Sequence, residues 1–179
     1  MGDWFEKLSK NFDMKYLIAI PLVTIPTFLF TKLMSILLLF AATFAVSYFG
    51  QRTKLKKFGL ELATFTTIIT GVSFGAIPGI IAGISTILFH DLLTGRISLY
   101  LIVVVPTFGL IGAIAGAYSH ADILLLGLGL TIFSHLVFIV FQTIIHKFPA
   151  RYLPYFFLNI VFNVLLFYNF APFVLKSLI

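Results

Sequence analysis

The stretch Leu60–Gly116 decides the fold and reads LELATFTTIITGVSFGAIPGIIAGISTILFHDLLTGRISLYLIVVVPTFGLIGAIAG. Glycine recurs in it at every fourth position, in two runs: Gly71, Gly75, Gly79, Gly83, and then Gly112, Gly116. Residues four apart share one face of a helix. Small residues on such a face let helix backbones approach closely inside a bilayer. The stretch therefore predicts a close-packed, membrane-embedded helical centre.

The composition of the whole chain indicates a membrane protein. Of its 179 residues, 60% are hydrophobic and 10% are charged, whereas soluble domains are about 25% charged. In a bilayer every backbone polar group must be paired within the protein, so only helices and closed barrels can span it. The apolar runs lack the period-2 alternation of barrel strands. We expect an all-α, polytopic membrane helix bundle that forms one transmembrane domain over residues 17–179.

The apolar runs predict six or seven transmembrane helices. They cover residues 17–30, 33–49, 60–75, 77–93, 98–118, 123–145 and 152–175. The first run would rise only about 21 Å, less than the roughly 30 Å hydrocarbon core, so it either crosses with help from its neighbours or does not cross. A weak break is expected at Thr31-Lys32, and a tight turn at Gly75–Gly79, because Pro78 suits the first turn of a new helix.

The charged residues predict how the chain is oriented. Residues 1–16 carry aromatic and leucine side chains near a helical period, which favours an amphipathic segment on the membrane surface. With seven crossings and a cytoplasmic N-terminus, ten of the 12 Lys and Arg residues lie on the cytoplasmic side, four of them in loop 50–58. That bias follows the positive-inside rule. We expect a multi-pass protein of the cell (cytoplasmic) membrane, with the N-terminus and loop 50–58 in the cytoplasm.

The residue content argues against an enzyme. The chain has no cysteine and six acidic residues, and it lacks the G-x-S-x-G, Walker and H-E-x-x-H patterns. Neither a catalytic residue, a metal site nor a cofactor is expected. Nucleic acid is not an expected partner either. The positive charge lies at the ends of apolar runs, where it indicates which side of the membrane each end faces.

The polar residues inside the apolar runs are the candidate site. A carboxylate at membrane depth is costly, so Glu61 and Asp91 are candidates by default, although each could instead be a structural acid at a helix end. His90 and Asp91, with His135, could also carry protons if they lay along one path.

Amides and imidazoles also gather on the last two apolar runs. Asn159 and Asn163 lie four apart on the last run, and His135 shares a face of the preceding run with Thr131. These side chains predict either hydrogen bonds between helices or a polar cavity that binds a solute. Tyr155 is expected to be an interfacial anchor.

Several motifs of the chain are shared with known membrane subunits: Glu61-Leu62-Ala63-Thr64-Phe65, Gly71, Phe74-Gly75, Pro78-Gly79, Gly83, Asp91 and Gly109–Gly116, with Ala41 and Ala45 as a docking motif. In them the chain resembles the substrate-binding membrane subunits (S components) of energy-coupling-factor transporters. Gly79, Gly83 and Asp91-Leu92-Leu93-Thr94-Gly95 also resemble a motif of the related rod-shape-determining membrane subunits. The resemblance implies a solute-binding subunit of an uptake transporter that needs separate energising partners.

Two functions follow as expectations. In the first, a small-molecule solute is held between helices near Glu61, Thr64, Asp91, Asn159 and Asn163. In the second, the chain is a non-catalytic scaffold or assembly subunit that packs on other membrane protein subunits through small-residue faces. The docking residues would be Ala41, Ala45, Gly71, Gly75, Gly79 and Gly83. In both, the lipid bilayer is a partner.

Overall fold

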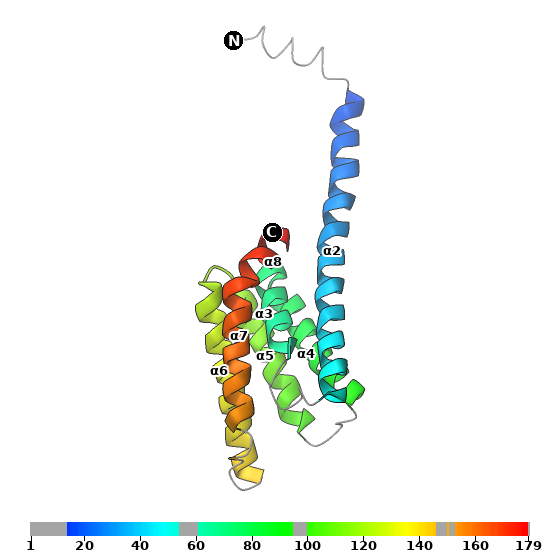
Figure 1. Ribbon diagram of the computed structural model, residues 1–179. Coiled ribbons are helices and arrows are strands. Elements are labelled where there is room, and N and C mark those ends of the chain that lie inside the picture. Colours follow the sequence, from blue (N-terminus) through cyan, green and yellow to red (C-terminus); the bar gives the residue numbers. More distant parts are fainter. Residues whose placement is uncertain (1–13, 54–60, 95–99, 146–149, 151–152, 179) are drawn as a thin grey trace. The chain divides into compact units, whose positions relative to one another are not determined.

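The computed structural model describes residues 14–53, 61–94, 100–145, 150 and 153–178, and within them it is all-helical. The helices are α2 (Met14–Arg52), α3 (Ala63–Phe74), α4 (Ala76–Thr94), α5 (Leu101–Ala117), α6 (Ile123–Ile145), α7 (Leu153–Asn169) and α8 (Ala171–Leu178) (Figure 1). Chain contacts divide the protein into two units, Met1–Ser35 and Ile36–Ile179. The predicted all-α fold is confirmed.

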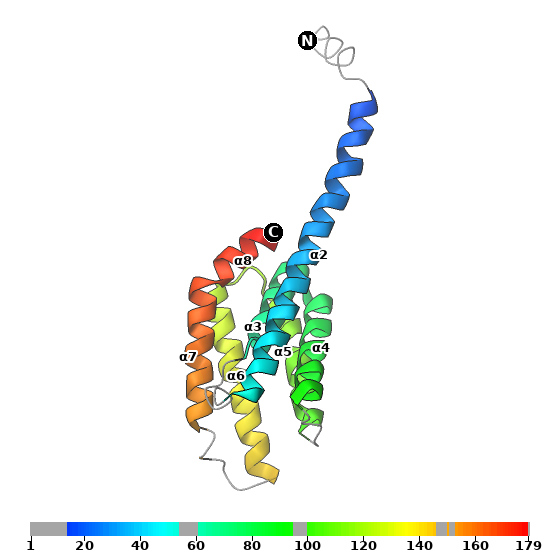
Figure 2. The same ribbon diagram turned by 45° about the vertical axis from the view of Figure 1, so that its right-hand side comes forward.

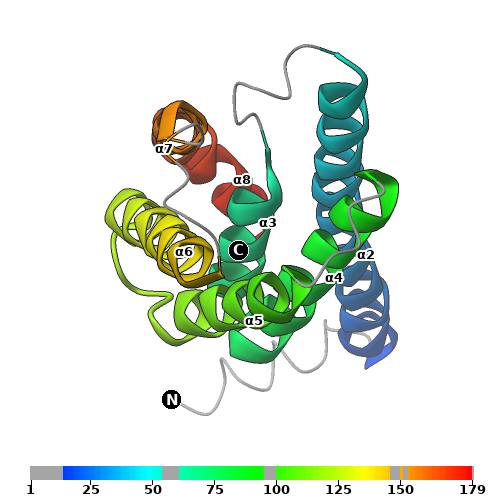
Figure 3. The same ribbon diagram turned by 90° about the horizontal axis from the view of Figure 1, so that it is seen from below.

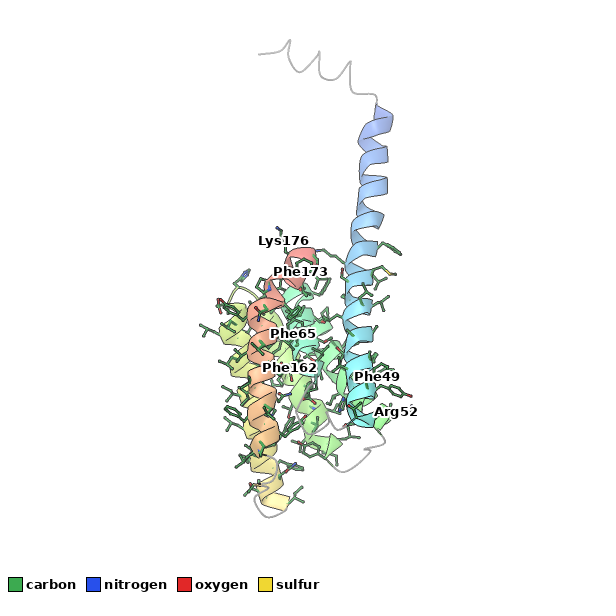
Figure 4. All side chains as sticks on the ribbon, viewed as in Figure 1. Phe49, Arg52, Phe65, Phe162, Phe173 and Lys176 are labelled. Atoms are coloured by element: carbon green, nitrogen blue, oxygen red, sulfur yellow. The ribbon has the colours of Figure 1, made fainter. Side chains whose placement is uncertain are left out.

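Helix α3 is the buried centre of the second unit. Every residue from Ala63 to Gly71 is buried, and Figure 3 shows α4, α5, α6 and α7 arranged around this helix. Ile68 and Ile69 are fully buried in the main hydrophobic cluster. The Phe65 ring lies 5.2 Å from the Phe167 ring of α7, and Figure 4 shows Phe65 inside the bundle. Of the three apolar helices α3, α4 and α5, the shortest is therefore the one that its neighbours cover most completely.

Glycines let α3, α4 and α5 approach at backbone distance. A Cβ added at Gly71 of α3 would lie 2.7 Å from the Gly112 carbonyl oxygen of α5. A Cβ at Gly79 or at Gly112 would overlap the backbone of the other residue, and one at Gly83 would overlap the Phe108 carbonyl. The close-packed helical centre predicted from the glycine spacing is confirmed, with both glycine runs facing each other.

The predicted turn between α3 and α4 is also confirmed. Gly75 has φ +96°, a left-handed conformation that residues with a side chain rarely adopt. Helix α4 starts at Ala76, which places Pro78 in the first turn, where its missing N–H costs no helical hydrogen bond. The chain therefore reverses at Gly75, and α4 packs along both α3 and α5.

Two predicted element boundaries are wrong. The break at Thr31-Lys32 is absent, because α2 runs through it as one 39-residue helix; neither threonine nor lysine interrupts a helix as proline or glycine can. The last run is two helices, because α7 and α8 meet at a bend of 50°. Pro172 falls in the first turn of α8, a position that favours a new helix start.

The described helices differ in whether they can cross a membrane. By length and composition, Lys32–Gly50 and Ile123–Ile145 can each cross, and α7 with α8 adds a third span if the bent pair acts as one. Helices α3, α4 and α5 are shorter apolar helices. Within the described residues two or three spans therefore meet the length criterion, and six or seven crossings stay a prediction. The amphipathic segment predicted at residues 1–16 and most of loop 50–58 lie outside the described residues.

The helix contact at Gly112 gives a testable prediction. Gly112→Ala should destabilise the protein by about 2–3 kcal/mol, because the methyl group has no room against the Gly79 backbone. Gly129→Ala is the matched control, since nothing lies within 4 Å of a Cβ added there. Unfolding of the purified protein in detergent would measure both changes, and equal stabilities would contradict the contact.

Candidate functional site

Threonine hydroxyls of α3 find hydrogen-bond partners within the bundle. The Thr66 hydroxyl lies 2.6 Å from the Thr43 hydroxyl of α2, and Thr70 donates to the Thr66 carbonyl at 2.7 Å. Thr67 donates to the Ala63 carbonyl in the same way. Thr64, a predicted binding residue, is buried with 2% exposure. The threonines thus add polar groups to the core without lowering its packing.

A second polar cluster joins α6 to α7, which lie side by side (Figure 2). His135 of α6 places its Nε2 atom 2.9 Å from Asn159 Oδ1 of α7. Asn163 donates from Nδ2 to the same Oδ1 and to the Asn159 backbone carbonyl, both at 3.0 Å. Both asparagines are fully buried and His135 is 5% exposed. The predicted hydrogen bond between helices is therefore confirmed for His135 and Asn159, whereas the bonds of Asn163 lie within α7.

One backbone carbonyl fixes the donors and acceptors of this cluster. The Asn159 carbonyl can only accept, so the Asn163 atom beside it is its NH₂ group. That NH₂ group also faces the Asn159 side chain, whose facing atom must then be the oxygen. His135 Nε2 faces the same oxygen and must donate to it. In a neutral imidazole the other nitrogen, Nδ1, is then an acceptor.

Two acceptors of the cluster have no partner. His135 Nδ1 and Asn163 Oδ1 are buried and receive no hydrogen bond from the described residues. A buried polar atom left unpaired costs about 1–3 kcal/mol, so native proteins rarely tolerate two in one cluster. Both atoms belong to side chains that share the Asn159 oxygen. The cluster can therefore accept hydrogen bonds from a donor that the described residues do not supply.

A carboxylate lies close to this cluster. Tyr155 of α7 donates its hydroxyl to Glu61 Oε2 at 3.0 Å, one helical turn before Asn159. Glu61 lies just before α3, so the segment that leads into α3 meets α7 beside the cluster. The Phe156 ring lies 4.8 Å from the His135 ring, and Phe138 lies 6.4 Å from it. We name Glu61, His135, Tyr155, Asn159 and Asn163 the acceptor cluster.

Asp91 is placed in a different part of the unit from Asn159. It is buried near the end of α4, beside His90, whose Nδ1 lies 2.8 Å from the Ser47 hydroxyl of α2. The His90–Ser47 bond joins α4 to α2, whereas His135 joins α6 to α7. Asn159 and Asn163 bond to each other, and Glu61 bonds to Tyr155, one helical turn before Asn159 on α7. Asp91 lies on α4, which packs on α3 and α5. That all of these residues bind one solute stays a prediction.

The predicted docking residues also separate into two groups. Gly71, Gly79 and Gly83 are buried against α5 within the chain, so their face is not open to a partner. The physical reason is that the complementary small-residue surface, at Gly112, lies in the same chain. Gly75 forms the turn and is half-buried, with nothing within 4 Å of a Cβ added there. Ala41 and Ala45 of α2 are exposed.

Tyr155 is a site residue that the sequence did not predict, whereas His135 was predicted to contribute either to interhelical hydrogen bonds or to a polar cavity. Tyr155 was interpreted as an interfacial anchor, but its hydroxyl reaches Glu61. The available signal was spacing: Tyr155, Asn159 and Asn163 recur every fourth residue and share one face of α7. Across the residues that the structure describes, no group of three or more His, Cys, Asp or Glu side chains could hold a metal ion.

Comparison of the chain with models of known protein families, with curated proteins and with solved structures finds no match. The geometry of the site therefore carries the functional argument.

The buried cluster predicts unequal effects of two substitutions on one helix. Asn159→Leu should lower stability by about 2–4 kcal/mol, because the His135 Nε2–H and the Asn163 amide lose their shared acceptor. Asn169→Leu is the control, since that exposed side chain bonds only locally, to the Leu165 carbonyl; its effect should stay within about 0.5 kcal/mol. Detergent-based unfolding titrations would compare them, and similar losses would contradict the cluster.

Proposed function

We propose that this chain is a multi-pass membrane protein that binds a small polar solute at the acceptor cluster and works with separate energising partners. The observation that carries the proposal is the pair of buried acceptors without a partner, His135 Nδ1 and Asn163 Oδ1. A bound solute would satisfy both. No step of covalent chemistry is needed, because the cluster offers hydrogen-bonding groups around one carboxylate rather than a nucleophile and its base.

The exposure of α6 supports a membrane setting for the site. Its outer face exposes large apolar side chains: Leu125, Ile132, Leu136, Val140 and Ile144. Its inner face buries Thr131, Ser134 and His135. Apolar residues outside and polar residues inside are the arrangement expected where lipid, rather than water, covers the surface.

The charged ends of the second unit fit the proposed orientation. Figure 4 shows Arg52 and Lys176 at opposite ends of that unit. Arg52 follows the α2 segment long enough to cross, and its guanidinium lies 4.4 Å from the centre of the Tyr48 ring. An aromatic ring with a cation is a common anchor at a membrane interface. We place the Arg52 end in the cytoplasm and the Lys176 end outside.

A second function, as an assembly subunit, is favoured by one face of α2. Ala41 and Ala45 are exposed there, together with Leu38 and Phe49, which are 71% and 64% exposed. Small residues flanked by large ones allow another helix to approach closely. A transporter subunit would use this face to dock on its energising partner, whereas a scaffold would use it without holding a solute.

Native mass spectrometry of the protein purified in mild detergent tests the proposal. We expect a stoichiometric small molecule, with occupancy at least tenfold lower in Asn163→Leu because one of the two free acceptors is removed. Asn169→Leu, on the exposed face of α7, should keep the wild-type occupancy.

Two further measurements keep the test decisive. Size-exclusion profiles show whether each variant is folded, and Tyr155→Phe, which keeps the ring and removes only the hydroxyl, replaces Asn163→Leu if that variant unfolds. A wild-type protein that carries no ligand but forms a stable complex dependent on Ala41 and Ala45 would overturn solute binding in favour of assembly.

A further inference from the structure

The unpaired groups of the acceptor cluster are of one chemical kind. The hydrogen bonds of Asn159 fix His135 Nδ1 and Asn163 Oδ1 as acceptors. Glu61 adds a carboxylate, which is an acceptor as well. A solute that fills this site must therefore bring hydrogen-bond donors, and a solute built from acceptors alone would leave the same atoms unpaired.

The surroundings of the cluster favour a positive charge. Glu61 supplies a carboxylate whose oxygen accepts the Tyr155 hydroxyl, and Tyr155 shares one face of α7 with Asn159 and Asn163. Phe156 is 7% exposed and Phe138 is 8% exposed, and both rings lie against His135. Aromatic rings attract cations, most strongly where water is excluded. Charge and ring placement therefore agree with the donor requirement.

Metal ions fit the cluster less well than an N–H cation. Zinc sites use three or more nitrogen, sulfur or carboxylate ligands, and His135 and Glu61 supply two. Sodium, potassium and other hard cations prefer a full shell of oxygen ligands, whereas the cluster offers the Glu61 carboxylate and Asn163 Oδ1 beside a histidine nitrogen. A protonated amine satisfies a nitrogen acceptor, an amide oxygen and a carboxylate equally well.

We infer that the solute of this site is a small organic cation with N–H donors, of the ammonium or amidinium type. The inference rests on the proposed function, and it adds the chemical class of the solute. The ammonium group would face Glu61, His135 Nδ1 and Asn163 Oδ1, and an apolar remainder would contact the Phe156 ring.

Thermal unfolding and calorimetric titration of the full chain in detergent test the inference with a size-matched probe series. The probes are ethylammonium, acetamidinium, tetramethylammonium, ethanol, acetate, potassium and zinc. Ethylammonium or acetamidinium should raise the unfolding midpoint by several degrees, and tetramethylammonium, which has charge but no N–H, should bind at least tenfold more weakly. Glu61→Gln should weaken ethylammonium or acetamidinium binding at least tenfold and still accept the Tyr155 hydroxyl bond.

The control variant is Asp122→Asn, which removes an exposed carboxylate that caps the start of α6 at the Leu125 N–H. Asparagine caps helices as well as aspartate does, so probe binding should be unchanged. Stronger binding of acetate, ethanol, potassium or zinc than of ethylammonium or acetamidinium would overturn the organic N–H cation and leave solute binding intact. If no probe binds and no ligand co-purifies, the inference and the proposed function both fall.

Discussion

The contact on which the rest of the structure depends is the backbone approach of three helices at Gly71, Gly79 and Gly112. Each of these glycines has another helix where a side chain would be. The contact holds α4 and α5 together and places α3 against both. Because α3 is then central, the residues just before it can lie close to α6 and α7. The position of Glu61 relative to α6 and α7 follows from this packing rather than from local sequence.

The acceptor cluster shows how a single main-chain group can set the chemistry of a site. The Asn159 carbonyl orients Asn163, Asn163 orients the Asn159 amide, and that amide selects the protonated nitrogen of His135. Neither amide can rotate without losing a hydrogen bond in a buried environment. The cluster is therefore organised before any solute arrives, which reduces the entropy that binding would cost.

Much of the fold could be predicted from the sequence because it depends on local chemistry. Apolar composition, four-residue glycine spacing and Pro78 predicted the helical class, the close packing and the turn at Gly75. The uninterrupted α2 and the bend before Pro172 could not be predicted, since Thr31-Lys32 is compatible with a helix and a proline in a first turn marks a possible start without requiring one.

The site could be predicted only in part, because it joins distant segments. Glu61 and Tyr155 are 94 residues apart, and no spacing rule relates them. Asn159 and Asn163 were identifiable as a pair on one face of a helix. Asp91 was also a polar residue in an apolar run, but its helix, α4, packs on α3 and α5, whereas both asparagines lie on α7. The glycine face was assigned to a partner because a single sequence does not reveal that its complement lies in the same chain.

The 12-residue length of α3 bears on how such a chain enters a bilayer. At about 1.5 Å per residue it rises roughly 18 Å, well short of a hydrocarbon core of about 30 Å. On its own it would leave unpaired backbone groups at its ends facing lipid, which is costly. Insertion of α3 is therefore expected to be coupled to α4 through the Gly75 turn, as a hairpin, and to be completed only when the later helices enclose it. The centre of the bundle would then be the last part to become stable during biogenesis.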